Sequence, residues 1–525
     1  MNKLKERFTN TYLQFQAETV LSDKTSYLIL ALIVFIVLIV RLLMINTPAL
    51  EWAAWKEIDY LTISKNYWQN GFNFLRPEVT WPAEPPRVTE MELPLVPFLA
   101  AVFYQLFGFG AFTARVVPLI AFLIMVIYVY KLAKRELGAY VGLLAGMATG
   151  LMPLYHPFSN TLFTEPAMIA MSVVSLYYMA EWVEHQRRRE QILALLALSL
   201  TFSLKLESLY LLLPLSWIAF RTYQFQFRKY FGFVLLIALS FVLPIIWYSY
   251  AYYLENTGAH LFGIFKGHNK SQIATMLTDL RWYRTMAGRI INGIFGGIYG
   301  SALFVLGLGL AVLNRKGGLF FAYLASVCIY FVLVAEGNVD APYRQLPMIP
   351  SASIFVALGA QTLVVALATI WKYISKNRSW LLAMPFVLTL FIPVMKLDEV
   401  FASNVPAHAD RWQLATEIRK YSNKTSKLVV VGEYSKHVGG YDLSPVLYYY
   451  SDLQGWSLKP EQWTVEYVES LRQKGATHFA VILPYGYPYD FVYLPEESYD
   501  AFVSEMRAKY PVLYEYQDQL LLDLR

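Results

Sequence analysis

Residues 27–45 read YLILALIVFIVLIVRLLMI, an almost uninterrupted apolar run with one arginine near its end. A membrane-spanning helix needs about 20 predominantly apolar residues, and this run has that length. It is too long for the apolar core of a secretion signal, and charged sequence without a small-residue cleavage site follows it. We therefore expect this segment to remain in the chain as a membrane anchor.

The composition extends this expectation to most of the chain. Apolar residues make up 57% of the 525 residues, charged residues only 16%, and the mean hydropathy is +0.39. These values exclude a single soluble globular domain. The lone cysteine, Cys328, excludes a disulfide framework and a cysteine-based zinc site. The net charge of +6 is typical of basic cytoplasmic loops in a membrane protein and does not require a nucleic-acid partner.

Apolar runs predict about eleven membrane-spanning helices. The pair 191–204 and 207–222 is short, and it fits either a tight hairpin or one broken element. The run from Leu93 to Phe109 is a further candidate span, although it can also lie on the outer surface. The other predicted spans are 25–46, 112–132, 139–154, 163–182, 230–253, 294–313, 317–335, 346–371 and 379–397.

The distribution of basic residues predicts the orientation. If Leu93–Phe109 does not cross the membrane, the lysine and arginine clusters all fall on one side, which is then the cytoplasmic side. This places the N-terminus inside and both the loop 47–111 and the C-terminal region outside. We expect an integral plasma (inner) membrane protein with a transmembrane domain at 1–397 and an extracytoplasmic domain at 398–525.

The C-terminal region has the composition of a soluble domain. Alternating helix and strand patterns there predict a small layered α/β domain. The run Val446–Ser451 lies between the first strand and the second helix and is left without an assignment. The predicted helices are Ala409–Tyr421, Glu461–Lys474 and Glu497–Tyr510, and the predicted strands are Lys427–Gly432, Thr477–Leu483 and Gln519–Leu524.

The first external loop carries two candidate bases, Glu57 and Asp59, in a segment rich in Trp and Pro. Long loops on a rigid scaffold often hold functional sites. A carboxylate near the lipid boundary is partly desolvated, which raises its pKa and makes it a better general base. The alternative is that both are ordinary solvated carboxylates.

Charged residues also interrupt apolar sequence elsewhere. Glu165 precedes Pro166 at the mouth of a predicted span, where it fits either a functional acid or a favourable helix start. Lys205 and Glu207 interrupt a long apolar stretch, either as functional groups or as a self-paired turn.

Two further predicted outer loops are rich in cations. Residues 254–293 contain His268, Arg281, Arg284 and Arg289, and a second loop ends in Tyr343 and Arg344. A guanidinium at the lipid boundary matches a phosphate group with paired donors. Contact with ordinary lipid headgroups is the alternative for all of them.

Several motifs in a fixed order carry a family resemblance. They are Trp55-Lys56-Glu57-Ile58-Asp59, then Glu92-Leu93-Pro94 leading to Arg115, then Phe158-Ser159-Asn160 with Glu165, then Leu204-Lys205, and finally Tyr343-Arg344-Gln345-Leu346-Pro347. In this order they resemble the GT-C glycosyltransferases of the protein O-mannosyltransferase and lipid A aminoarabinose transferase superfamily, particularly its bacterial polysaccharide-associated members. The resemblance covers the whole membrane part.

This resemblance implies an inverting glycosyltransferase with a polyprenyl-phosphate sugar as donor. The acceptor would be a hydroxyl group of a glycan, a lipid or a protein outside the cytoplasm. Asp59 is the expected base, although Glu57 stays open because the family's usual Asp-Glu pair is interrupted here by Ile58. Glu165 would orient the acceptor or the base.

The same resemblance leaves the phosphate ligands to be found. Glu92 stands where aminoarabinose transferases carry a phosphate-binding lysine, which argues against that particular activity. Phosphate binding then falls to Lys205, Arg344 and the arginines at 281–289. No cofactor is predicted, since no cluster of carboxylates or histidines has ligand spacing, and a divalent metal stays open.

Three alternatives are weighed against this hypothesis. A transporter or flippase of lipid-linked sugars would also be polytopic, but repeated halves are missing from the sequence. A non-catalytic scaffold would not need charges at the membrane boundary. An oligosaccharide ligase is the nearest alternative among enzymes.

Overall fold

The computed structural model describes residues 11, 12, 15, 19–43, 45–50, 54–259, 261–266, 271–370, 379–394, 409–431, 445–482, 496–517 and 519–525. The chain divides into two compact units. The first, called here the helical unit, comprises Met1–Asn46, Arg115–Trp247 and Asn269–Ser403. The second, called here the mixed unit, comprises Thr47–Ala114, Tyr248–His268 and Asn404–Arg525.

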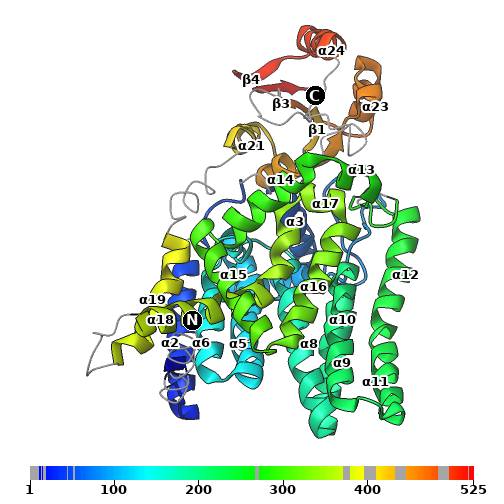
Figure 1. Ribbon diagram of the computed structural model, residues 1–525. Helices are drawn as coiled ribbons and strands as arrows, with labels where there is room; N and C mark the ends of the chain where they lie inside the picture. The colour runs from blue at the N-terminus through cyan, green and yellow to red at the C-terminus, as the bar shows by residue number, and fades with distance from the viewer. Residues whose placement is uncertain are drawn as a thin grey trace. The chain divides into compact units, whose positions relative to one another are not determined.

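The described part of the helical unit consists of mostly apolar helices of 9 to 27 residues, with six short helices of four to seven residues between them (Figure 1). Helix α9 packs against both α8 and α11, and α10 packs against α8. In chain order the helices are α2 Asp23–Leu42, α5 Ala111–Leu137, α6 Ala139–Leu151, α7 Tyr155–Phe158, α8 Glu165–His185, α9 Arg188–Leu204, the 3-10 helix η1 Leu206–Leu211, α10 Leu212–Tyr223, α11 Phe227–Ser240, α12 Val242–Thr257, α13 Ile273–Thr278, α14 Leu280–Gly288, the π-helix η2 Arg289–Ile294, α15 Ile298–Leu313, α16 Gly318–Leu333, α17 Ala335–Asp340, the 3-10 helix η3 Pro342–Met348, α18 Ile349–Ile370 and α19 Ser379–Val394. Residues 111–114 of α5 and 248–257 of α12 belong to the mixed unit.

All eleven predicted spans fall on helices, but fewer helices reach full membrane length. Within the described residues, five helices are long and apolar enough to cross a bilayer. The number is six if the helices Leu280–Ile294 and Ile298–Leu313, which meet with a bend of 92°, count as one span. The other predicted spans are shorter because turns interrupt them; α6, for example, has 13 residues, about 20 Å. The run Leu93–Phe109 forms α4, Leu95–Phe107, which is also too short to cross.

Glycines bring α15 and α18 into close contact. A Cβ atom on Gly307 would lie 1.8 Å from the carbonyl oxygen of Phe355, and one on Gly359 would lie 1.8 Å from that of Leu303. Small residues allow helix backbones to approach closely where lipid offers no hydrophobic driving force between helices. Any larger residue at either position would push the two helices apart.

The mixed unit contains a five-stranded sheet in the order β2-β1-β3-β5-β4. Strand β1 pairs in parallel with β2 and β3, whereas β5 pairs antiparallel with β3 and β4. Its elements are α3 Ala54–Gln69, α4, α21 Ala409–Tyr421, β1 Lys427–Val431, α22 Val446–Ser451, β2 Gln454–Ser457, the 3-10 helix η5 Pro460–Gln462, α23 Val465–Gln473, β3 His478–Ile482, α24 Glu496–Lys509, β4 Val512–Tyr516 and β5 Gln519–Asp523.

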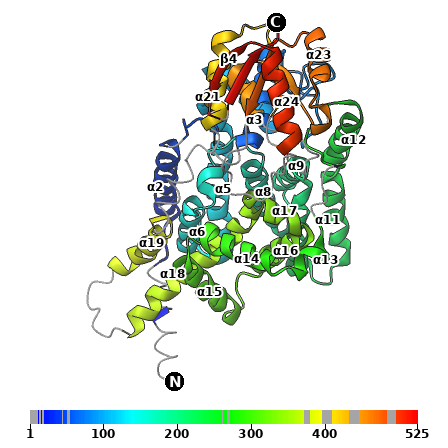
Figure 2. The same cartoon turned by 90° about the horizontal axis from the view of Figure 1, so that it is seen from above.

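Alternation along the strands gives the sheet two apolar faces, with helices on both (Figure 2). Val429 and Val431 of β1 share a cluster with residues of α23 and α24, whereas Leu428 and Val430 share one with residues of α21 and α22. The predicted α/β domain is therefore present. Val446–Ser451 is a helix, and strands β2 and β4 were not predicted.

The first external loop is packed into this sheet domain. Trp81 belongs to one apolar cluster and Ala83 to the other, so the loop reaches both faces of the sheet. The carbonyl oxygen of Thr80 accepts a hydrogen bond from the backbone of Gly455 at 3.4 Å. The segment that carries Glu57 and Asp59 is thus joined to the C-terminal domain by apolar packing. The predicted domain boundary at 397/398 lies outside the described residues.

Candidate active site

Lys205 lies at a break between two helices of the helical unit. Helix α9 ends at Leu204, Lys205 adopts an extended backbone, and η1 begins at Leu206. The hydroxyl of Ser208 donates to the carbonyl oxygens of Thr201 at 3.1 Å and Lys205 at 2.6 Å, so carbonyls at the end of α9 are satisfied despite the break. The break directs a lysine into an otherwise apolar bundle, where it is buried.

Glu165 is the first partner of this lysine. Helix α8 begins at Glu165 with Pro166 directly after it, a start that suits both an acid and a proline. Its Oε1 lies 3.1 Å from the Nζ atom of Lys205. The residue that begins helix α8 therefore also pairs with a buried cation.

Glu207 and Arg344 complete a network of four alternating charges. Glu207 Oε2 lies 3.8 Å from Lys205 Nζ, and its Oε1 forms an ion pair with Arg344. The order Glu165–Lys205–Glu207–Arg344 balances two positive charges with two negative ones. Removing one member would leave an uncompensated charge in a buried region, which is strongly unfavourable.

Arg344 is seated by the short helices η3 and α17. Its guanidinium carbon lies 5.9 Å from the ring centre of Tyr343, whose ring packs edge-on against Phe158 and Phe163. A Cβ on Gly337 would lie 3.3 Å from both Cζ and Nε of Arg344, so glycine at this position leaves the guanidinium its space.

The remaining predicted cations have different surroundings. Arg289 donates from Nη1 to the carbonyl oxygen of Asn338 at 2.5 Å, and the side chain of Gln345 donates to the same oxygen at 2.8 Å. Arg281 is exposed and paired with Asp279 at 3.0 Å, and Arg284 is exposed. His268 lies outside the described residues. Arg289 is thus linked through the carbonyl oxygen of Asn338 to Gln345, the residue after Arg344.

Asp59 and Glu57 lie in α3 of the mixed unit. Each is only 2% exposed, but residues two apart in a helix point about 160° away from each other, so they face different surroundings. Asp59 lies about 60° from Lys56, on the same side of the helix. Burial raises the pKa of Asp59 well above its usual range, and the positive charge of Lys56 opposes that rise. The two candidate bases are therefore separate groups and do not form a carboxylate pair.

Glu92 also belongs to the mixed unit and contacts α3. Its Oε2 accepts a hydrogen bond at 3.0 Å from the hydroxyl of Tyr60, the residue after Asp59. The ring of Tyr60 packs against Phe262 at 5.9 Å between ring centres. Glu92 thus helps to fix the turn of α3 that carries Asp59.

The structure also buries cations that were not among the predicted site residues, namely Arg41, Lys56, Arg115 and Arg411. Arg41 of α2 donates from Nη2 to the carbonyl oxygen of Gly150 at 2.8 Å and contacts the imidazole of His156. Burial, together with the charge of Arg41, lowers the pKa of His156 to about 3, so its ring is neutral and accepts from the guanidinium. The signal was present, since a charge within an apolar run is a functional candidate.

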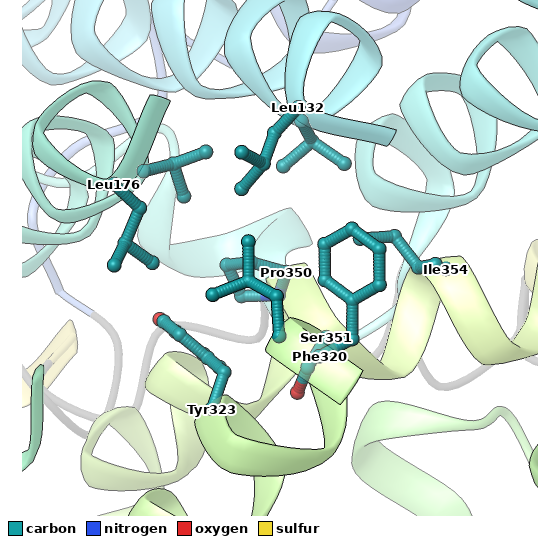
Figure 3. Close-up of a pocket in the computed structure, with 10 residues that line it drawn as sticks. Leu132, Leu176, Phe320, Tyr323, Pro350, Ser351 and Ile354 are labelled. Carbon is teal, nitrogen blue, oxygen red and sulfur yellow. The ribbon is translucent and has the colours of Figure 1, made fainter. Parts of the chain in front are cut away.

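A small cavity lies within the helical unit between α5, α8, α16 and α18 (Figure 3). Leu132, Leu176, Phe320 and Ile354 line it, and none of its described lining residues carries a charge. Such a cavity offers no cation for a phosphate. The described part of the chain also holds no group of three or more His, Cys, Asp and Glu residues that could hold a metal ion.

Comparisons with known proteins show what this chain is similar to. Residues 86–248 match the family model described as dolichyl-phosphate-mannose-protein mannosyltransferase. No curated protein matches the sequence. The fold is similar to that of ArnT from Cupriavidus metallidurans in the apo state, with a TM-score of 0.65 and 14% identity over 96% of this chain and 98% of ArnT.

Two further structures extend the comparison. ArnT bound to undecaprenyl phosphate matches with a TM-score of 0.66 and 14% identity over 94% of this chain and 97% of ArnT. The archaeal oligosaccharyltransferase AglB from Archaeoglobus fulgidus, in complex with an inhibitory peptide and a dolichol-phosphate, matches with a TM-score of 0.50 and 11% identity over 87% of this chain and 69% of AglB.

The family match over residues 86–248 and the fold confirm the predicted resemblance to GT-C glycosyltransferases. The matched family model and the ArnT structure are of the protein mannosyltransferase and aminoarabinose transferase type, which is the type that the sequence motifs resemble. The predicted fold class, a helical membrane protein with a small C-terminal α/β domain, is confirmed as well.

Proposed function

We propose that this protein transfers a sugar from a polyprenyl-phosphate donor to an acceptor hydroxyl on the non-cytoplasmic side of the plasma membrane. The observation that supports this proposal most directly is the buried network in which the carboxylate of Glu207 bridges Lys205 and Arg344. Two fixed cations this close suit the phosphate of a lipid-linked donor. ArnT bound to undecaprenyl phosphate supports the choice of donor.

The proposed reaction is a single displacement. The acceptor oxygen forms a bond to the anomeric carbon, the bond from that carbon to the phosphate oxygen breaks, and its electron pair stays on the phosphate. Lys205 and Arg344 stabilise the charge that develops there, so the leaving group needs no proton donor. One direct displacement inverts the anomeric carbon.

Asp59 is the proposed base, which takes the proton from the acceptor hydroxyl. Its raised pKa increases its basicity, since a base works best when its pKa lies near the working pH. Glu57 faces a different side of α3 and is proposed as a supporting residue. Glu165 is proposed to act through Lys205, which it holds at 3.1 Å.

The test is turnover by the purified protein with a panel of polyprenyl-phosphate sugars and a simple acceptor. We expect inverted product and released polyprenyl phosphate with wild type and Glu57→Gln, and transfer that is roughly 10²–10⁴-fold lower with Asp59→Asn. Full activity of Asp59→Asn with a dead Glu57→Gln would reassign the base. Movement of the intact lipid-linked sugar across vesicles, without cleavage, would instead indicate a flippase.

A further inference from the structure

Glu207 occupies the place between the two proposed phosphate ligands. One oxygen of its carboxylate lies 3.8 Å from Lys205 Nζ, and the other pairs with Arg344. A phosphate group presents oxygens to the same two kinds of donor. The carboxylate therefore makes the contacts that a donor phosphate would make.

Exposure separates Glu207 from the other members of the network. Its side chain is 24% exposed, whereas those of Lys205 and Arg344 are each 7% exposed and that of Glu165 is 3% exposed. Moving a carboxylate into water is easiest where it already touches water, because less of its hydration has to be restored. Glu207 is thus the member that can leave the network most readily.

The charges also favour an exchange. The four described members of the network, Glu165, Lys205, Glu207 and Arg344, have charges that sum to zero. A sugar–phosphate–lipid diester carries one negative charge, the same as the carboxylate that it would replace. Cleavage then yields a phosphate monoester with a charge of about −1.5 to −2 at neutral pH. With Glu207 turned outward, the additional charge develops beside two cations that no longer share a carboxylate.

Arg344 has a hydrogen-bond donor that its ion pair with Glu207 does not use. Its Nε–H is buried and, within the described residues, has no hydrogen-bond partner. Buried donors are almost always paired in folded proteins, so this N–H favours an acceptor oxygen that a bound phosphate would bring. A phosphate has more acceptor oxygens than the carboxylate that it would displace.

We propose that Glu207 is an exchangeable counter-ion, which neutralises Lys205 and Arg344 in the empty enzyme and is displaced by the phosphate of the donor. This proposal rests on the proposed function. It makes Glu207 a positioning residue that sets affinity for the phosphate group, because every binding event must first break its two ion pairs.

The experiment measures the affinity of undecaprenyl phosphate for the full-length protein in nanodiscs. Glu207→Gln is expected to bind it about tenfold more tightly than wild type, the affinity equivalent of one charge-assisted hydrogen bond that no longer has to be exchanged. Undecaprenol, which lacks the phosphate, should show no difference between the two proteins.

Glu165→Gln is the matched control, because Glu165 also binds Lys205 but is nearly inaccessible. It should bind undecaprenyl phosphate no more tightly than wild type. Glu207→Asp, whose shorter side chain reaches the two cations less well, should give an intermediate gain and serves if Glu207→Gln does not fold.

The outcomes separate the two proposals. Wild type that binds the lipid and transfers sugar, with a folded Glu207→Gln of equal or weaker affinity, overturns the counter-ion alone. Tighter binding by Glu207→Gln without sugar transfer by any variant supports the counter-ion and overturns the glycosyltransferase. Binding of undecaprenyl phosphate to none of the proteins overturns both.

Discussion

The helical and the mixed unit bury charge in opposite ways. In the helical unit, Glu165, Lys205, Glu207 and Arg344 alternate in sign and neutralise one another. In the mixed unit, burial raises the pKa of Asp59 despite a nearby lysine, so its ionised form is disfavoured. The two cations of the network are suited to holding an anion. The carboxylate of Asp59, whose ionised form is disfavoured, is suited to accepting a proton.

The largest expected effect concerns Asp59 and activity. We expect Asp59→Asn to lower transfer by roughly 10²–10⁴-fold, the usual contribution of a general base, with nearly unchanged binding of undecaprenyl phosphate. Wild-type transfer should fall as the pH drops through the raised pKa of Asp59, since the base must be ionised. The acidic limb of the rate profile should therefore lie above the ordinary aspartate range.

The stability of the protein should depend on pH in the direction opposite to that of its activity. Because the folded-state pKa of Asp59 is raised, its favourable contribution is present below the unfolded-state pKa and is lost as the pH rises through the folded-state value. Asp59→Asn should therefore raise the Tm at neutral pH, and this gain should shrink in acid. A lower Tm for the folded variant at pH 7 would contradict the comparison between the two units.

The second prediction breaks the network of the helical unit. Lys205→Met should destabilise the protein by about 3–5 kcal/mol, because Glu165 stays buried without its cation. Adding Glu165→Gln to Lys205→Met should recover most of that loss without restoring lipid binding. Denaturant unfolding and undecaprenyl phosphate binding check the two parts, and equal stability of both variants would show that the network is not coupled.

The third prediction tests how the mixed unit is held together. Trp81 is buried in an apolar cluster with Leu414 of α21 and Leu521 of β5. Trp81→Ala should cost about 3 kcal/mol, as expected for a large buried aromatic residue, and should lower transfer by loosening the loop that carries Asp59. Protease cleavage of the first external loop, with donor binding measured in parallel, distinguishes this from damage to the helical unit.

The smallest effect is expected at Gly337. An added Cβ would meet Arg344 at 3.3 Å and Val334 Cγ1 at 3.0 Å, so the guanidinium must shift slightly. We expect Gly337→Ala to raise the donor KM roughly threefold with little change in Tm, because the helix propensity of alanine offsets the crowding. Gly309→Ala, at a position with open space around it, is the control and should leave KM unchanged.

Much of the fold could be predicted from local signals. Long apolar runs located the helices of the membrane part, and the strand and helix patterns located the strands β1, β3 and β5 and the helices α21, α23 and α24. The misses have local causes. Val446–Ser451 contains valine and three tyrosines, residues that favour strands, yet it folds as a helix against α21. Strand β2 is only four residues long and contains a glycine.

The candidate site was predictable only residue by residue. An unusual charge in an apolar run is visible in the sequence because burying it is unfavourable, and this singled out Glu165, Lys205 and Arg344. Glu207 was noted only as a partner for Lys205, and its bridge to Arg344 joins segments 137 positions apart. The assignments of Asp59 as base and of Lys205 and Arg344 as phosphate ligands stay predictions.

By itself, the sequence determined that the chain lies mostly in a membrane and which segments form its helices. It also determined which charged residues stand in apolar sequence, where burying a charge is unfavourable. Only the tertiary structure decided which charges pair and which candidate carboxylates share a face. The physical reason is that the free energy of moving a side chain out of water depends mainly on that side chain. The energy of an ion pair depends on the distance between two groups that only folding brings together.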